Sequence, residues 1–152
     1  MELKDTMRIA LFGNLHRTDM EHELHELVDF FHGKNIVVLL EEYMQYYIEH
    51  KFHHSFDKIE LISDDNFEAD LALSVGGDGT FLNTALQVGK KEIPILGINT
   101  GRLGFLADVA KDEIITALQG VLENKYTIED RSVIKVQTMD GSRLDSPYAL
   151  ND

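Results

Sequence analysis

The sequence of 152 residues contains no cysteine, which excludes disulfide bonds, thiolate metal sites and cysteine nucleophiles. It is also poor in basic residues, because 14 lysines and arginines stand against 27 aspartates and glutamates, a formal net charge of −13. Surfaces that bind nucleic acid or an anionic membrane need a basic patch, so we expect no partner of either kind. No apolar run approaches the ~20 residues that cross a bilayer, and the N-terminus lacks a signal-peptide pattern. These absences predict a cytoplasmic protein.

Short apolar runs alternate with stretches of helical spacing along most of the chain. The apolar runs predict strands at residues 7–12, 35–40, 69–75 and 93–98. The helical spacing predicts helices at residues 19–32, 41–52, 80–88 and 111–122. The stretch from 53 to 68 is polar and reads as irregular. Alternation of this kind favours an α/β fold, an open and mostly parallel sheet with right-handed crossovers and flanking helices.

The pattern changes after Asn124. Residues 132–139 alternate apolar and polar side chains, Asp140-Gly141 offers a tight turn, and residues 143–150 resume a strand-like pattern. We therefore predict an antiparallel hairpin. A hairpin of only two strands is marginally stable in water, so further β-structure is expected beside it. The predicted organisation is an α/β domain at 1–130, followed at 131–152 by the start of a truncated β-rich domain.

A glycine-rich turn, GGDGT, follows the third predicted strand and includes Gly76, Gly77, Gly79 and Thr80. Ligands of an open parallel sheet bind beyond the carboxyl ends of its strands. Glycine lets the backbone approach a ligand closely, and the next helix would present unpaired N–H groups and a partial positive charge. Together these features favour a phosphate group as the ligand of this turn. The turn lacks the lysine of a Walker loop and is not a dinucleotide GxGxxG motif.

Asp78, within the same turn, needs a separate explanation because a bound phosphate would repel its carboxylate. It could accept a proton from a hydroxyl nucleophile, or it could help to hold a metal that bridges phosphates. The alternative is an aspartate that only stabilises its own turn by a hydrogen bond to the backbone. Thr80 is expected to cap the following helix.

Two further stretches extend the pattern of this turn. GGDGTFLNTA at 76–85, followed by ILGINTGRLGFLAD at 95–108, resembles the NAD kinase family, and Asn151-Asp152 is similar to that family's asparagine–acidic pair. NAD kinases transfer a phosphoryl group to the 2′-hydroxyl of the adenosine ribose of NAD, which makes NADP. The resemblance implies a fold like that of NAD kinases and diacylglycerol kinases, ATP and NAD as ligands, and a homo-oligomer. Mg²⁺ should accompany ATP, held mostly by phosphates and water rather than by protein ligands.

The resemblance also implies roles for individual residues. Asp78 would be the general base on the ribose hydroxyl, and Gly79 would approach the same nucleotide. Phe105 and Leu106 would line the NAD pocket, while Asn151-Asp152 would hydrogen-bond ribose or base edges. The complete set of predicted nucleotide-binding residues is Gly76, Gly77, Gly79, Thr80, Arg102, Phe105, Leu106, Asn151 and Asp152.

Other functions stay open on the sequence alone. The glycine- and serine-rich motif of NAD kinases has no counterpart here, so we expect this polypeptide by itself to be inactive. A lipid or sugar kinase of the same superfamily is one alternative, although GINTGRLGFL favours an NAD kinase over a lipid kinase. A non-catalytic nucleotide-binding module, in which Asp78 only shapes the turn, is another.

Several side chains allow two interpretations. Arg102 could meet a phosphate with two N–H groups or be an ordinary surface arginine. Phe105 could stack on a base, although its residue type alone favours a place in the core. Four aromatic residues near the second predicted helix suggest core packing or a subunit contact rather than ligand stacking. They are Tyr43, Tyr46, Tyr47 and Phe52.

The segment HELHE contains His22, His25 and Glu26. The two histidines share one helical face, which makes metal binding conceivable. The spacing is not that of HExxH, and no third ligand is evident from the sequence. We therefore predict a solvated helix face and no protein metal site.

Overall fold

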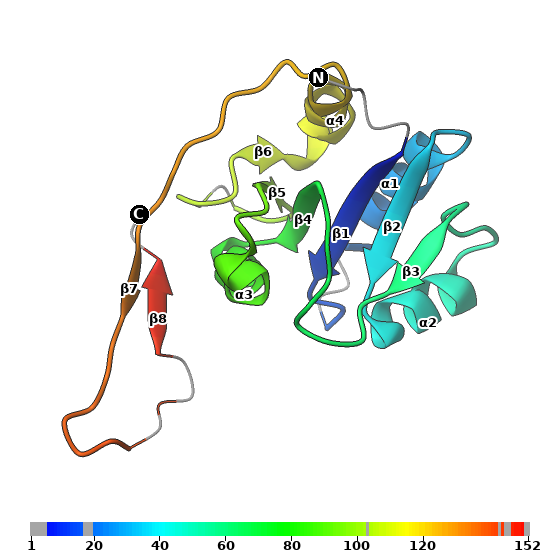
Figure 1. Cartoon of the computed structure of the whole chain (residues 1–152). Helices are drawn as coiled ribbons and strands as arrows, with labels where there is room; N and C mark the ends of the chain where they lie inside the picture. The colour runs from blue at the N-terminus through cyan, green and yellow to red at the C-terminus, as the bar shows by residue number, and fades with distance from the viewer. Residues whose placement is uncertain (1–5, 17–19, 103, 143, 145–146, 151–152) are drawn as a thin grey trace.

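The computed structural model describes residues 6–16, 20–102, 104–142, 144 and 147–150 (Figure 1). Six strands form one sheet in the order β3-β2-β1-β4-β5-β6, and every neighbouring pair is parallel. This confirms the predicted open parallel sheet. The strands are β1 (Met7–Gly13), β2 (Ile36–Leu40), β3 (Ile59–Leu61), β4 (Leu71–Gly76), β5 (Ile95–Asn99) and β6 (Val109–Ala110).

Helices connect the strands on both faces of the sheet (Figure 1). In the described part of the chain, none of them combines the length and the apolar character that crossing a membrane requires. The α-helices are α1 (Glu21–Phe31), α2 (Glu42–Lys51), α3 (Asp78–Val88) and α4 (Ile114–Leu122), with 3₁₀ turns η2 (Gly89–Lys91) and η3 (Lys111–Glu113).

The core lies on both sides of the central strands. In β1, Ile9 and Leu11 pack with residues of α1, α2 and α4, whereas Ala10 and Phe12 face the opposite side, with Val88 of α3. Successive side chains of a strand point to opposite faces, so a strand covered on both sides needs an unbroken apolar run. This explains why the central strands carry the clearest signal in the sequence.

Two strands were absent from the sequence prediction. β3 lies within the stretch predicted to be irregular, and β6 has only two residues. β3 is an edge strand in which Glu60 and Leu61 are exposed, so neither strand shows the apolar run of a buried strand.

Helix α3 begins at Asp78, two residues before the predicted start, and Gly77 is its N-cap without a side-chain cap bond. The prediction that Thr80 caps this helix is therefore wrong, because Thr80 lies inside the first turn. The backbone N–H of Phe81 already donates to the carbonyl of Gly77, at 3.0 Å.

The predicted antiparallel hairpin is present as a separate two-stranded sheet of β7 (Val133–Lys135) and β8 (Tyr148–Leu150). The paired segments are shorter than predicted, because a long connection separates them and contains Asp140 and Gly141. The side chain of Asp140 accepts the backbone N–H of Ser142 at 3.0 Å, which stabilises the turn. Figure 1 shows the hairpin standing away from the six-stranded sheet.

Candidate active site

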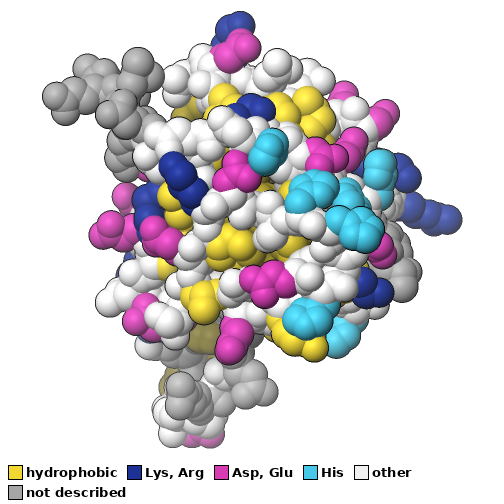
Figure 2. Space-filling model, turned by 90° about the vertical axis from the view of Figure 1, so that its right-hand side faces the viewer, with side chains coloured by type: hydrophobic (Ala, Val, Ile, Leu, Met, Phe, Trp, Pro, Cys, Tyr) yellow, Lys and Arg dark blue, Asp and Glu magenta, His cyan; other side chains and the backbone are white. Residues whose placement is uncertain are grey.

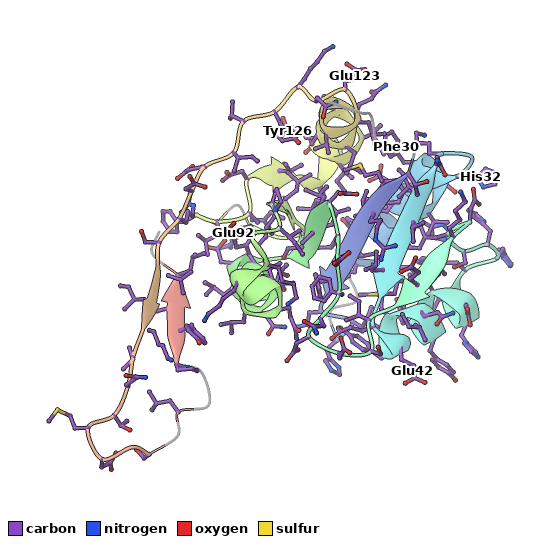
Figure 3. All side chains as sticks on the ribbon, in the orientation of Figure 1. Phe30, His32, Glu42, Glu92, Glu123 and Tyr126 are labelled. Atoms are coloured by element: carbon purple, nitrogen blue, oxygen red, sulfur yellow. The ribbon has the colours of Figure 1, made fainter. Side chains whose placement is uncertain are left out.

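The site lies where the strand order reverses direction. The chain adds β2 and β3 on one side of β1 and then returns to place β4, β5 and β6 on the other side. Connections therefore diverge at the carboxyl ends of β1 and β4, the position at which open α/β sheets bind ligands. In Figure 3 the labelled Glu42 marks the end of the sheet where the carboxyl ends of the strands lie, and the labelled His32 lies at the other end, where the strands begin.

An open cavity of about 770 Å³ occupies this crevice. Its walls come from the end of β1, from α2 and from the first turns of α3. Residues of all three walls include Phe12, Gly13, Tyr43, Tyr46, Thr80 and Asn83. The volume is within the usual range of small-molecule sites, so the cavity suits a nucleotide-sized ligand.

Asp78 joins the GGDGT turn to the segment GRLGFLAD. Its Oδ2 accepts the backbone N–H of Phe105 at 3.0 Å, and its Oδ1 accepts those of Leu106 at 3.1 Å and Ala107 at 3.4 Å. These bonds, led by the one from Phe105, lower the pKa of Asp78 below its ordinary value, because N–H donors favour the charged form. The carboxylate is therefore ionised at neutral pH.

Glycine is required at two positions where the motifs approach each other. A Cβ added at Gly104 would lie 2.4–2.6 Å from the carboxylate atoms of Asp78. A Cβ at Gly76 would lie 2.3 Å from Oγ1 of Thr80. Both distances are too short for a side chain, so the two glycines let the strand end, the helix start and the GRLGFLAD segment pack together.

Asn99 is a positioning residue that the sequence analysis did not single out. It ends β5 and is only 3% exposed. Its Oδ1 accepts the N–H of Gly101 at 2.9 Å, and its Nδ2 donates to the carbonyl of Arg102 at 2.8 Å. The available signal was an asparagine just before a glycine turn, where asparagine side chains bond the backbone two residues on. The N–H of Thr100 also donates to the carbonyl of Gly76, at 3.0 Å.

The structure brings many of the predicted site residues together. Gly79 and Thr80 line the cavity, and the backbones of Phe105 and Leu106 contact Asp78. Phe105 is 82% exposed, so the prediction of a core position from its residue type is wrong. The side chain of Arg102 is also exposed. Asn151 and Asp152 lie outside the described residues, as Figure 1 indicates.

The aromatic residues in α2 and directly after it divide between two roles. Phe52 is buried, as core packing predicts, but Tyr43 and Tyr46 are exposed and line the cavity. The hydroxyl of Tyr43 donates to the carbonyl of Gly13 at 3.2 Å, which ties α2 to the end of β1. Partial desolvation of its hydroxyl, followed by the neighbouring Glu41, raises the pKa of Tyr43. Core packing is therefore the wrong expectation for these two tyrosines, whereas the alternative expectation of a subunit contact stays a prediction.

Comparisons with known proteins place these features in a family. Residues 9–126 match the family described as the ATP-NAD kinase N-terminal domain. The chain is 43% identical over 153 residues to the NAD kinase of Bacteroides fragilis, covering 96% of this chain and 50% of that protein. It is 41% identical over 147 residues to the NAD kinase of Flavobacterium psychrophilum, covering 95% of this chain and 49% of that protein.

The fold has a counterpart among solved structures. The crystal structure of yeast NADH kinase complexed with NADH superposes with a TM-score of 0.77 at 15% sequence identity, covering 97% of this chain and 46% of that one. The chain spans about half the length of the curated relatives it matches. On the family match and the identity to these relatives, the chain belongs to the NAD kinase family.

Proposed function

We propose that this chain is the nucleotide-binding half of an NAD kinase, which transfers a phosphoryl group from ATP to the 2′-hydroxyl of the adenosine ribose of NAD and so contributes to NADP synthesis. The observation that carries the proposal is the position of Asp78, which follows the carboxyl end of β4, directly precedes Gly79 and Thr80 of the cavity wall, and is bonded to the GRLGFLAD segment. Family membership supports the same reaction.

In this proposal Asp78 is the general base. A carboxylate offers about four lone-pair positions, and the three backbone N–H groups occupy three of them, two on Oδ1 and one on Oδ2. The fourth, on Oδ2, is left to accept the hydrogen bond of the ribose 2′-hydroxyl. The 2′-oxygen then bonds to the γ-phosphorus, the bond from that phosphorus to the β–γ bridging oxygen breaks, ADP leaves, and the hydroxyl proton passes to Asp78.

Backbone groups would hold the phosphates. The first turn of α3 presents N–H groups that lack partners within the helix, and Gly79 and Thr80 of this turn line the cavity. On the other side of Asp78, the exposed ring of Phe105 and the side chain of Leu106 would line the NAD pocket. Gly76, Gly77, Arg102, Asn151 and Asp152 complete the proposed nucleotide-binding set.

Mg²⁺ fits this site as a companion of ATP rather than as an ion held by the protein. Asp78 uses three of its lone-pair positions on backbone N–H groups, which leaves too few oxygens for a protein cage. When bound, the ion would neutralise charge on the transferred phosphate. From the resemblance to the family we also propose a homo-oligomer, and a cytoplasmic location.

One observation favours a second candidate function. Asp78 bonds a segment almost 30 residues away rather than its own turn, so it also organises the GRLGFLAD segment. A non-catalytic nucleotide-binding module would need this contact and nothing more from Asp78. The two functions differ in whether the charge of Asp78 is needed for turnover.

Replacing Asp78 by asparagine in a protein of the full length of the curated relatives tests the proposal. Turnover should fall roughly 10²–10⁴-fold, because a neutral amide accepts no proton, while NAD affinity measured by calorimetry should fall far less, because the amide oxygen can still accept the N–H groups of Leu106 and Ala107. Asp140→Asn is the matched control, since Asp140 also accepts a backbone N–H but lies in the hairpin, and it should leave turnover unchanged. Undiminished turnover in the Asp78 variant would exclude the general-base role.

A further inference from the structure

We propose that His25, Asp29 and His54, none of which lines the cavity, form a zinc-binding site between α1 and the loop that follows α2. One ligand atom of each side chain lies within 4.8 Å of the other two. The site is independent of the proposed kinase reaction, because its side chains come from α1 and the loop that follows α2 and not from the GGDGT turn or the GRLGFLAD segment.

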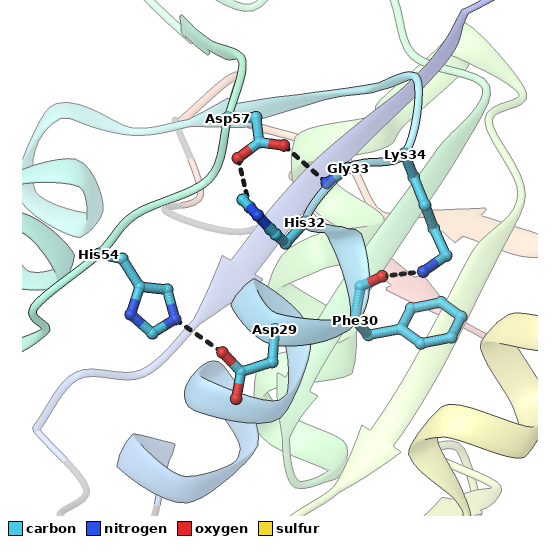
Figure 4. Close-up of polar contacts among 7 residues, drawn as sticks. All are labelled: Asp29, Phe30, His32, Gly33, Lys34, His54 and Asp57. Carbon is cyan, nitrogen blue, oxygen red and sulfur yellow. Dashed lines mark hydrogen bonds and ion pairs between the residues drawn. The ribbon is translucent and has the colours of Figure 1, made fainter.

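The fold places the three side chains together. His25 and Asp29 are four residues apart on α1, so they share one face of the helix. His54 reaches them from the loop, and its Nε2 lies 2.6 Å from Oδ1 of Asp29 (Figure 4). The ring of His25 is positioned by the buried Phe52, with ring centroids 4.1 Å apart.

Two imidazoles and one carboxylate are a zinc ligand set, with water available for the fourth tetrahedral position. Zn–N and Zn–O bonds of ~2.0–2.2 Å place tetrahedral ligand atoms about 3.4 Å apart. Nε2 of His54 and Oδ1 of Asp29 are 2.6 Å apart, and every pair of ligand atoms lies within 4.8 Å, so small side-chain rotations would bring the three atoms to the spacing that zinc needs. His54 and Asp29 are 50% and 66% exposed, which lets an ion enter from solvent without burying an unpaired charge.

The surroundings favour a cation that stabilises the fold. Figure 2 shows histidine side chains gathered on the face that carries α2 and the β3 edge. Nearby, Asp57 already links the same loop to the end of α1, through His32 at 2.9 Å and the N–H of Gly33 at 2.8 Å (Figure 4). A zinc ion would add a second link between α1 and this loop. The net charge of −13 further favours cation binding.

The sequence had pointed to a different pair. HELHE suggested His22 with His25 and offered no third ligand, whereas the cluster found among the described residues omits His22. The missing ligands were Asp29, one helical turn beyond His25, and His54, which is distant in sequence. This difference gives the experiment its matched controls.

Titration of the purified chain with zinc chloride, followed by calorimetry, tests the site. The unmodified chain should bind one zinc ion. The substitutions His25→Ala, Asp29→Asn and His54→Ala should each weaken binding by at least about tenfold, because losing even a residue that only hydrogen-bonds a metal ligand costs about that much affinity. His22→Ala and His53→Ala should leave the affinity unchanged, because they remove neighbouring histidines outside the cluster. Circular dichroism checks that each variant is folded.

A second measurement separates a bound ion from surface adsorption. Zinc should raise the thermal midpoint of the unmodified chain, a chelator should reverse the rise, and the variant lacking all three ligands should show none. Absence of zinc binding, equal affinity in ligand and control variants, or loss of affinity in the His22 variant would each overturn the proposal.

Discussion

Asp78 is the side chain on which the candidate site depends most. It starts α3 and simultaneously accepts N–H groups from Phe105, Leu106 and Ala107. Its negative charge also suits the positive end of the helix dipole. The same bonds that fix its orientation lower its pKa, so a rigid position and an ionised state have one cause.

Gly104→Ala should disturb this arrangement without removing any functional group. The new methyl group would lie 2.4–2.6 Å from the Asp78 carboxylate, so either the carboxylate or the segment must move. We expect a loss of about 1–3 kcal/mol in the free energy of unfolding, the usual cost of overpacking. In the full-length protein, turnover and NAD affinity should fall together.

Urea unfolding measures this loss, and Gly120→Ala is its control. Gly120 lies inside α4, where an added Cβ meets only the carbonyl of Lys125 at 3.4 Å. Alanine in a helix interior should stabilise by roughly 0.5–1 kcal/mol. Equal effects from the two substitutions would contradict the tight contact inferred at Gly104.

Asp57 gives a prediction of pH dependence. The N–H of Gly33, followed by His32, lowers the pKa of this carboxyl below its ordinary value of 3.8. A lowered folded-state pKa stabilises the protein above the unfolded value, and this stabilisation is lost as the pH falls through the folded value. The difference in urea midpoint between the unmodified chain and Asp57→Asn should therefore be full at neutral pH and shrink below pH 3.8. A difference that persists in strong acid would refute this origin.

Among the strands, the sequence analysis succeeded where burial on both faces imposes an unbroken apolar run. β1 and β4 are such strands, and both were predicted to within one or two residues. β3 and β6 were not predicted, because a short edge strand is not covered on both faces and so needs no unbroken apolar run. The order of the strands followed from no local pattern, since pairing of β1 with β4 joins residues about 60 positions apart.

The same limit applies to the candidate site. The GGDGT and GRLGFLAD motifs marked its position, because their residue types are informative by themselves. The bonds from Asp78 to the GRLGFLAD segment and the approach of His54 to Asp29 depend on tertiary packing. Local spacing carries no information about either contact.

The ion pair of Arg8 with Glu60 connects β1 to β3 across β2. Two N–H groups of the guanidinium meet the two carboxylate oxygens, each at 2.7 Å, and both side chains are partly exposed. Because exposed pairs contribute at most about 1 kcal/mol, Glu60→Gln should lower the free energy of unfolding only slightly. The loss should shrink in high salt, which denaturation at two salt concentrations would show; a salt-independent loss would point to packing instead.

Considered as a whole, the molecule consists of a compact sheet with its helices and a hairpin of different character. Val133, Ile134 and Met139 of the hairpin segment are exposed, although they are apolar. The division into a domain at 1–130 and a β-rich segment at 131–152 remains a prediction. An exposed apolar hairpin of this kind is suited to pairing with further β-structure.

Hydrogen exchange should distinguish the two parts. We expect the amides of β7 and β8 to exchange much faster than those of β4, because β4 is buried throughout and the hairpin strands have little covering. Exchange followed by mass spectrometry in a dilute sample measures this difference. Equally slow exchange in the hairpin of a monomer would contradict the expectation.

The anchoring of the GRLGFLAD segment restricts how its length can change. Asn99 fixes the segment near its beginning, and Asp78 fixes it near its end. Inserting or deleting a single residue between these anchors would bring a different amide opposite each carboxylate oxygen. Surface loops commonly tolerate such changes, but this one should not. Its residue count is therefore as strongly constrained as the identity of its side chains.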